Sequence, residues 1–166
     1  MQTGEVMRQR GFAYLLLLFI VAIMGAAMAA TSMVWHTVVQ RDKERDLLYA
    51  GHEFRRAIGL YYERTPGPVK QYPLKLEDLL KDQRQPNLSR YLRKIYIDPL
   101  TASQKWGLVP GPNGTITGVY SLAQETPIKT GNFDQIDQDF AEKNSYREWR
   151  FIYMPKQATT IPAVNQ

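Results

Sequence analysis

The chain contains no cysteine, and only two of its 166 residues are histidines. Without cysteine, neither disulfide bonds nor thiolate metal sites are available. The two histidines, His36 and His52, belong to no H-E-x-x-H metal motif. The sequence also has no G-x-S-x-G nucleophile motif and no glycine-rich phosphate loop after a strand. We therefore expect a protein that is not an enzyme.

Charged side chains are absent from Gly11 to Gln40, a stretch of 30 residues, and residues 12–30 are almost wholly apolar. A helix needs about 20 apolar residues to cross a hydrocarbon core roughly 30 Å thick. The run is therefore long enough for a membrane span, and it is rather long for the core of a signal peptide. Positive residues lie near both of its ends, so charge bias leaves the topology undecided.

A second interpretation of this run stays open, because Ala27-Met28-Ala29 is an A-x-A element of the kind that signal peptidase recognises. Cleavage near Ala29 would give a soluble secreted binding domain that begins near Ala30. Against it, the charge-free run continues for another ten residues and merges with an amphipathic pattern.

Proline is absent from residues 12–62, and the sequence Thr65-Pro66-Gly67-Pro68 then ends any helix. Between these points, apolar residues recur three and four apart, which places them on one helix face: Leu47, Ala50, Phe54, Ala57, Ile58 and Tyr61. The pattern predicts one continuous helix over residues 12–62, apolar all round in its first half and amphipathic in its second. Gly25, Gly51 and Gly59 weaken this helix locally, because each glycine lowers helix stability by roughly 1 kcal/mol relative to alanine.

The remaining residues predict a small sheet domain packed on the amphipathic half of the helix. Two strand-like runs, KWGLV and TITGVYSL, flank a turn in which Asn113-Gly114 favours a hairpin. A third run, EWRFIYM, places Trp149, Phe151 and Tyr153 on the strand face expected against the helix. A short helix is expected over residues 74–82, and Ser89 is expected to cap another turn.

Two charged clusters could bind ligands, and we interpret both as solvated surface. One is basic and interleaved with tyrosines, a composition that also suits nucleic acid: Arg84, Arg90, Tyr91, Arg93, Lys94 and Tyr96. The other comprises Asp134, Asp137 and Asp139, whose spacing could suit a hard cation but lacks the glycine turn of a dedicated loop. Accordingly, no nucleic acid, cofactor or metal residue is assigned.

Several features together resemble the type IV pilin and type II secretion pseudopilin superfamily: a basic leader, Gly11-Phe12, a long apolar helix start and a small C-terminal sheet domain. The segments YLRKIYIDPLT, WGLV and GVYSL resemble the C-terminal domain of the major (G-type) pseudopilins. The resemblance implies an α+β, pilin-like fold in which one long N-terminal helix packs on a small antiparallel sheet of about three strands. The implied segments are a leader (1–11), a transmembrane or filament-core helix half (12–40), an amphipathic half (41–64), a periplasmic sheet domain (65–155) and a disordered tail (156–166).

By this resemblance, a prepilin peptidase cuts between Gly11 and Phe12, and Phe12 is then N-methylated. The mature protein is expected in the bacterial inner membrane as a single-pass subunit, with its N-terminus cytoplasmic and its C-terminal domain periplasmic. An inner-membrane assembly platform would draw it from the lipid and stack it with copies or other pseudopilins into a periplasmic filament for type II protein secretion. A minor, tip or initiating subunit of a type IV pilus system is the alternative within this class.

Two features depart from the family pattern. The fifth mature position, normally a glutamate that pairs with the N-terminal ammonium of an adjacent subunit, is Leu16 here. A carboxylate in the apolar region costs roughly 2.5–3.5 kcal/mol on insertion scales, and Leu16 removes both that cost and the pairing. The acidic loop that binds calcium in major pseudopilins is replaced by AQETPIKTG, which has no clustered carboxylates, so calcium is not supported.

Overall fold

The computed structural model describes the backbone of residues 6–84 and 88–155, and all side chains in these ranges except those of residues 6–10 and 27–34. The expected tail, residues 156–166, lies outside the described residues, as do the first five residues of the expected leader. The chain divides into two compact units, Met1–Arg41 and Asp42–Gln166.

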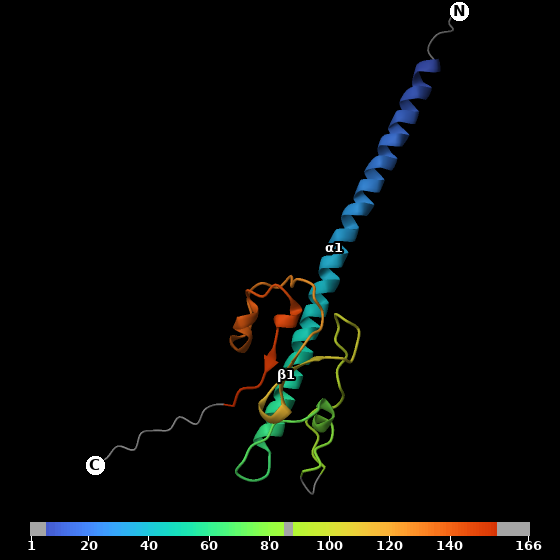
Figure 1. Ribbon diagram of the computed structural model, residues 1–166. Coiled ribbons are helices and arrows are strands. Elements are labelled where there is room, and N and C mark those ends of the chain that lie inside the picture. Colours follow the sequence, from blue (N-terminus) through green and yellow to red (C-terminus); the bar gives the residue numbers. More distant parts are fainter. Residues whose placement is uncertain (1–5, 85–87, 156–166) are drawn as a thin grey trace, which may run out of the picture. The chain divides into compact units, whose positions relative to one another are not determined.

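A single helix, α1, runs from Val6 to Glu63 (Figure 1). It begins six residues before the predicted start, because the leader residues that precede Gly11 contain no proline and favour a helix. The helix continues through Gly25 without local unwinding. It ends where expected, and the Thr65 hydroxyl donates to the carbonyl of Tyr61, 3.1 Å away, which satisfies one acceptor of the last turn.

In the first unit, every described side chain from residue 11 to residue 26 is exposed. Within the described residues, no helical stretch combines the length and the apolar character needed to cross a membrane. Residues 27–34, which fall inside the expected span and include the expected signal-peptidase site near Ala29, have side chains that lie outside the described ones.

The second unit contains a three-stranded antiparallel sheet in the order β1-β2-β3. The strands are β1 (Gly107–Pro110), β2 (Ile116–Tyr120) and β3 (Phe151–Ile152). The predicted hairpin joins β1 and β2, and both Asn113 and Gly114 adopt positive φ angles of 55° and 74° in its turn. The α+β class, with a helix packed on a small antiparallel sheet, is confirmed.

The core forms where the predicted apolar stripe of α1 meets the sheet and the segments around it. Leu47, Phe54 and Ile58 of α1 are fully buried. Phe151 and Tyr153 lie against α1, as the alternation predicted, and their rings occupy the space above two helix glycines. A Cβ at Gly51 would overlap the Phe151 ring, and one at Gly59 would lie 2.6 Å from Tyr153 Cε2. These two glycines therefore permit close approach of the strand.

Two local predictions are wrong. The helix expected over 74–82 is only a single 3₁₀ turn, η1 (Leu76–Leu79). The carbonyl of Leu79 accepts hydrogen bonds from the amides of Tyr91 and Leu92, 2.9 and 3.0 Å away, so this backbone pairs with the following segment. Ser89 caps no helix; instead, its carbonyl accepts from the amide of Asp82 in an isolated bridge.

Candidate functional site

Each of the site residues that the resemblance implies lies on the exposed first part of α1. Phe12 is 70% exposed and Leu16 is 52% exposed. Gly11 is helical, and a Cβ at this position would meet no atom within 4 Å. Packing among the described residues therefore does not require glycine at residue 11.

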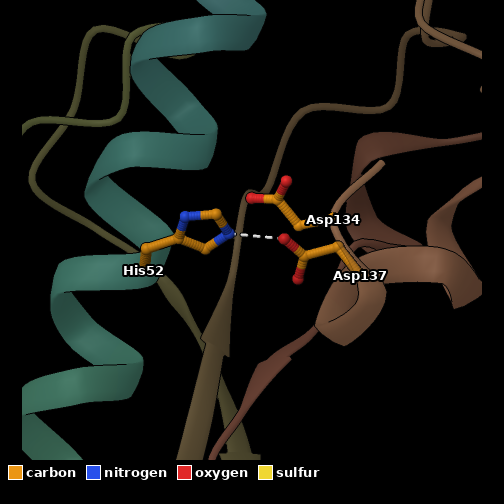
Figure 2. Close-up of side chains that lie close together, drawn as sticks. All are labelled: His52, Asp134 and Asp137. Carbon is orange, nitrogen blue, oxygen red and sulfur yellow. Dashed lines mark hydrogen bonds and ion pairs between the residues drawn. The ribbon is translucent and has the colours of Figure 1, made fainter. Parts of the chain in front are cut away.

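A second candidate site lies on the C-terminal unit, where a histidine and two aspartates meet. His52 belongs to α1, Asp137 lies inside the 3₁₀ turn η3 (Gln135–Phe140), and Asp134 immediately precedes that turn. Figure 2 shows the His52 ring projecting from α1 toward both carboxylates. One ligand atom from each residue lies within 4.8 Å of the other two.

Asp137 is the fixed member of this group. Asp137 is only 1% exposed, and its two carboxylate oxygens have different partners. One oxygen is hydrogen-bonded to His52 Nε2 at 2.5 Å, and the other accepts from Arg55 at 2.6 Å. The interpretation of this aspartate as part of a solvated acidic loop is therefore wrong.

The electrostatic environment keeps Asp137 ionised. Burial by itself raises the pKa of the Asp137 carboxyl. The hydrogen bonds from His52 and Arg55, together with the charge of Arg55, outweigh burial and hold that pKa below its usual value. Arg55 is itself 7% exposed, so the carboxylate and guanidinium form a buried ion pair.

Asp134 differs from Asp137 in both exposure and bonding. It occupies the N-cap position of η3, where an aspartate side chain ordinarily accepts a hydrogen bond from the next turn. Its side chain makes no such bond, and it is exposed to solvent beside His52. Asp139, grouped with it from the sequence, is also exposed and is not among the three clustered ligands.

The basic cluster is partly internal. Arg84 donates to both oxygens of Asp82 and to the carbonyl of Tyr61, and its guanidinium lies 3.4 Å from the centre of the Tyr61 ring. The hydrogen bond from Arg84 lowers the pKa of Asp82 to about 2. Arg84 therefore holds the end of α1 to the following segment, whereas Arg90 and Arg93 are exposed.

Comparison with known proteins finds no family model, no curated protein and no solved structure that matches the chain. We therefore infer the function from the chain's own residues.

Proposed function

We propose that the chain is a structural, pilin-like subunit that assembles through the apolar first part of α1. The observation that carries this proposal is the exposure of residues 11–26. These residues include a continuous run of large apolar side chains with no charge, and every one is exposed. An exposed apolar surface of this extent marks contact with protein or lipid.

The second part of α1 packs within the chain, and this agrees with a role in assembly for the first part alone. Its apolar stripe is buried against the sheet, where Leu47, Phe54 and Ile58 have no exposed surface. One helix thus has an apolar segment, residues 11–26, that is exposed within the described part of the chain, and a segment that belongs to a packed unit. In the proposed function, the exposed apolar segment provides membrane anchoring and helix-to-helix contacts, and the packed segment belongs to the periplasmic sheet domain.

Maturation follows from the same proposal. A prepilin peptidase would cut between Gly11 and Phe12, Phe12 would be methylated, and the apolar helix would remain in the inner membrane with its N-terminus cytoplasmic. An assembly platform would then move subunits into a filament that serves type II secretion. Leu16 provides no charge for pairing, so association rests on apolar packing, which replaces lipid contacts with protein contacts.

The first experiment measures the intact mass of the protein isolated from cell membranes. A chain that begins at Phe12, with or without one methyl group, supports the proposal. Because a Cβ at Gly11 would meet nothing within 4 Å outside the helix's own backbone, Gly11→Ala introduces no clash, and valine has a higher helix propensity than glycine. Gly11→Ala should mature more slowly than wild type, and Gly11→Val should stay uncut. Full maturation of Gly11→Val, or a chain that begins near Ala30, would contradict the proposal.

The second experiment uses the absence of cysteine, which makes every introduced thiol unique. Leu18→Cys places a thiol on the exposed apolar part of α1, where Leu18 is 48% exposed. Leu108→Cys is the matched control, because Leu108 is 45% exposed but lies on β1. Oxidation in membranes of cells that carry the assembly machinery should give covalent dimers for Leu18→Cys and far fewer for Leu108→Cys. Equal yields would refute assembly through α1.

A further inference from the structure

The chemistry of the three clustered ligands on the C-terminal unit selects one class of metal ion. One imidazole nitrogen and two carboxylate oxygens form a ligand set that suits Zn²⁺. Calcium needs six to eight oxygen ligands, which this group does not supply. We propose that His52, Asp134 and Asp137 bind one zinc ion, a role that goes beyond the structural function proposed above.

The geometry needs only small movements to accept the ion. Ligand atoms bonded to a tetrahedral zinc at about 2.0–2.1 Å lie roughly 3.3 Å from one another. His52 Nε2 and Asp137 Oδ2 are 2.5 Å apart, so they must separate by about 0.8 Å, and the neutral imidazole then carries its proton on Nδ1, which leaves the Nε2 lone pair for the ion. The His52 side chain is 36% exposed, and Asp134 is also exposed, so both can move while Asp137 stays fixed.

Arg55 acts as a positioning residue for this site. Its guanidinium donates a hydrogen bond to Oδ1 of Asp137. The other oxygen, Oδ2, is directed at His52, and Figure 2 shows this contact as a dashed line. Hydrogen bonds of this kind orient metal-binding carboxylates. Two carboxylates and one guanidinium sum to a net charge of −1, and an imidazole binds metal in its neutral form, so a divalent cation is still attracted.

The bonding of Asp134 supports the same assignment. Within the described residues its carboxylate accepts no hydrogen bond, although the N-cap position of η3 offers amide donors. It lies instead within 4.8 Å of the other two ligand atoms. A zinc ion would give this carboxylate a partner. The ion would also link α1, through His52, to the segment of Asp134 and Asp137, which follows His52 by more than 80 residues.

The test titrates zinc chloride into the full chain in detergent micelles, after chelator treatment and removal of any polyhistidine tag. Calorimetry gives the stoichiometry, and thermal unfolding gives the stabilisation that binding to the folded state must produce. The variants are Asp134→Asn and His52→Gln. Asp139→Asn is the matched control, because Asp139 is an exposed acid of the same turn that is not among the clustered ligands.

We expect one zinc ion per wild-type chain and an increase in Tm. Asp134→Asn and His52→Gln should each weaken zinc binding by at least about tenfold, whereas Asp139→Asn should bind like wild type. Because Asp134 is exposed and accepts no hydrogen bond within the described residues, Asp134→Asn should keep the wild-type circular dichroism without metal. Failure of the wild type to bind zinc, tighter binding of calcium, or wild-type affinity in Asp134→Asn would each overturn the assignment.

Discussion

Replacing Glu44 with alanine should strongly destabilise the C-terminal unit. Glu44 lies on α1, is 2% exposed, and collects three hydrogen bonds on one carboxylate oxygen. The amides of Ile128 and Lys129 donate from 2.6 and 3.1 Å, and the hydroxyl of Tyr146 donates from 2.8 Å. Its side chain thereby fixes a loop and a core tyrosine to the helix.

The expected magnitude follows from what Glu44→Ala leaves behind. A hydrogen bond to a charged group contributes about 1.5–3 kcal/mol, and a buried donor without a partner costs about 1–3 kcal/mol. Because all three donors share one oxygen, their contributions overlap, and we expect a total loss of about 3–5 kcal/mol in the free energy of unfolding. Glu44→Gln keeps a carbonyl acceptor of similar shape, so its loss should be smaller, about 1–2 kcal/mol.

The assay is urea unfolding of the full chain, followed by the fluorescence of the buried Trp106 and Trp149. Asp46→Ala is the matched control, since Asp46 is an exposed acid on the same stretch of α1. Hydrogen exchange at the amides of Ile128 and Lys129 should accelerate in Glu44→Ala alone. A loss below about 1 kcal/mol, or a loss equal to that of Asp46→Ala, would refute the assigned role of the carboxylate.

Two further changes test other contacts in the same unfolding assay. Gly51→Ala should destabilise the C-terminal unit by about 1–3 kcal/mol, because the new Cβ overlaps the buried Phe151 ring. This loss should exceed the gain from the better helix propensity of alanine. Unchanged or increased stability would contradict this packing. The pKa of Asp82 is lowered to about 2, so its ionised form stabilises the fold above about pH 4, and that contribution is lost as the pH falls through 2. Asp82→Asn should therefore remove about 2 kcal/mol of pH dependence between pH 4 and pH 2, and an unchanged acid limb would refute the assignment.

The parts of the fold that were predictable depend on short-range patterns. The hairpin between β1 and β2 follows from the Asn113-Gly114 turn, and the buried stripe of α1 follows from apolar spacing. The face of Phe151 follows from strand alternation. The extent of β3 was not predictable, because the strand comprises only Phe151 and Ile152, with one further backbone hydrogen bond from the Tyr153 amide to the Thr117 carbonyl of β2. Similarly, the helix expected at 74–82 fails because Leu79 bonds to residues that follow it by more than ten positions.

The candidate metal cluster was missed because its members lie far apart in the sequence. His52 and Asp137 are separated by 85 residues, and no spacing motif reaches that far. A weaker signal was present. Glu44 precedes Leu47 by three positions, and Arg55 precedes Ile58 by three, so both charges neighbour the apolar stripe. Charges beside an apolar stripe indicate buried polar contacts, as Glu44 and Arg55 form here.

These buried charges give the packing of α1 a fixed register. The Phe151 and Tyr153 rings, which lie over Gly51 and Gly59, fix the register of the segment around β3. Glu44 and Arg55 fix the register of the segment around residues 128–137, through the amides of Ile128 and Lys129 and through the Asp137 carboxylate respectively. Sliding by one turn, about 5.4 Å, would break both sets of bonds. Each buried charge left without its partner would cost about 3–5 kcal/mol, which is more than the apolar contacts of one turn could restore. We infer that these polar contacts determine where on α1 the segment around residues 128–137 docks.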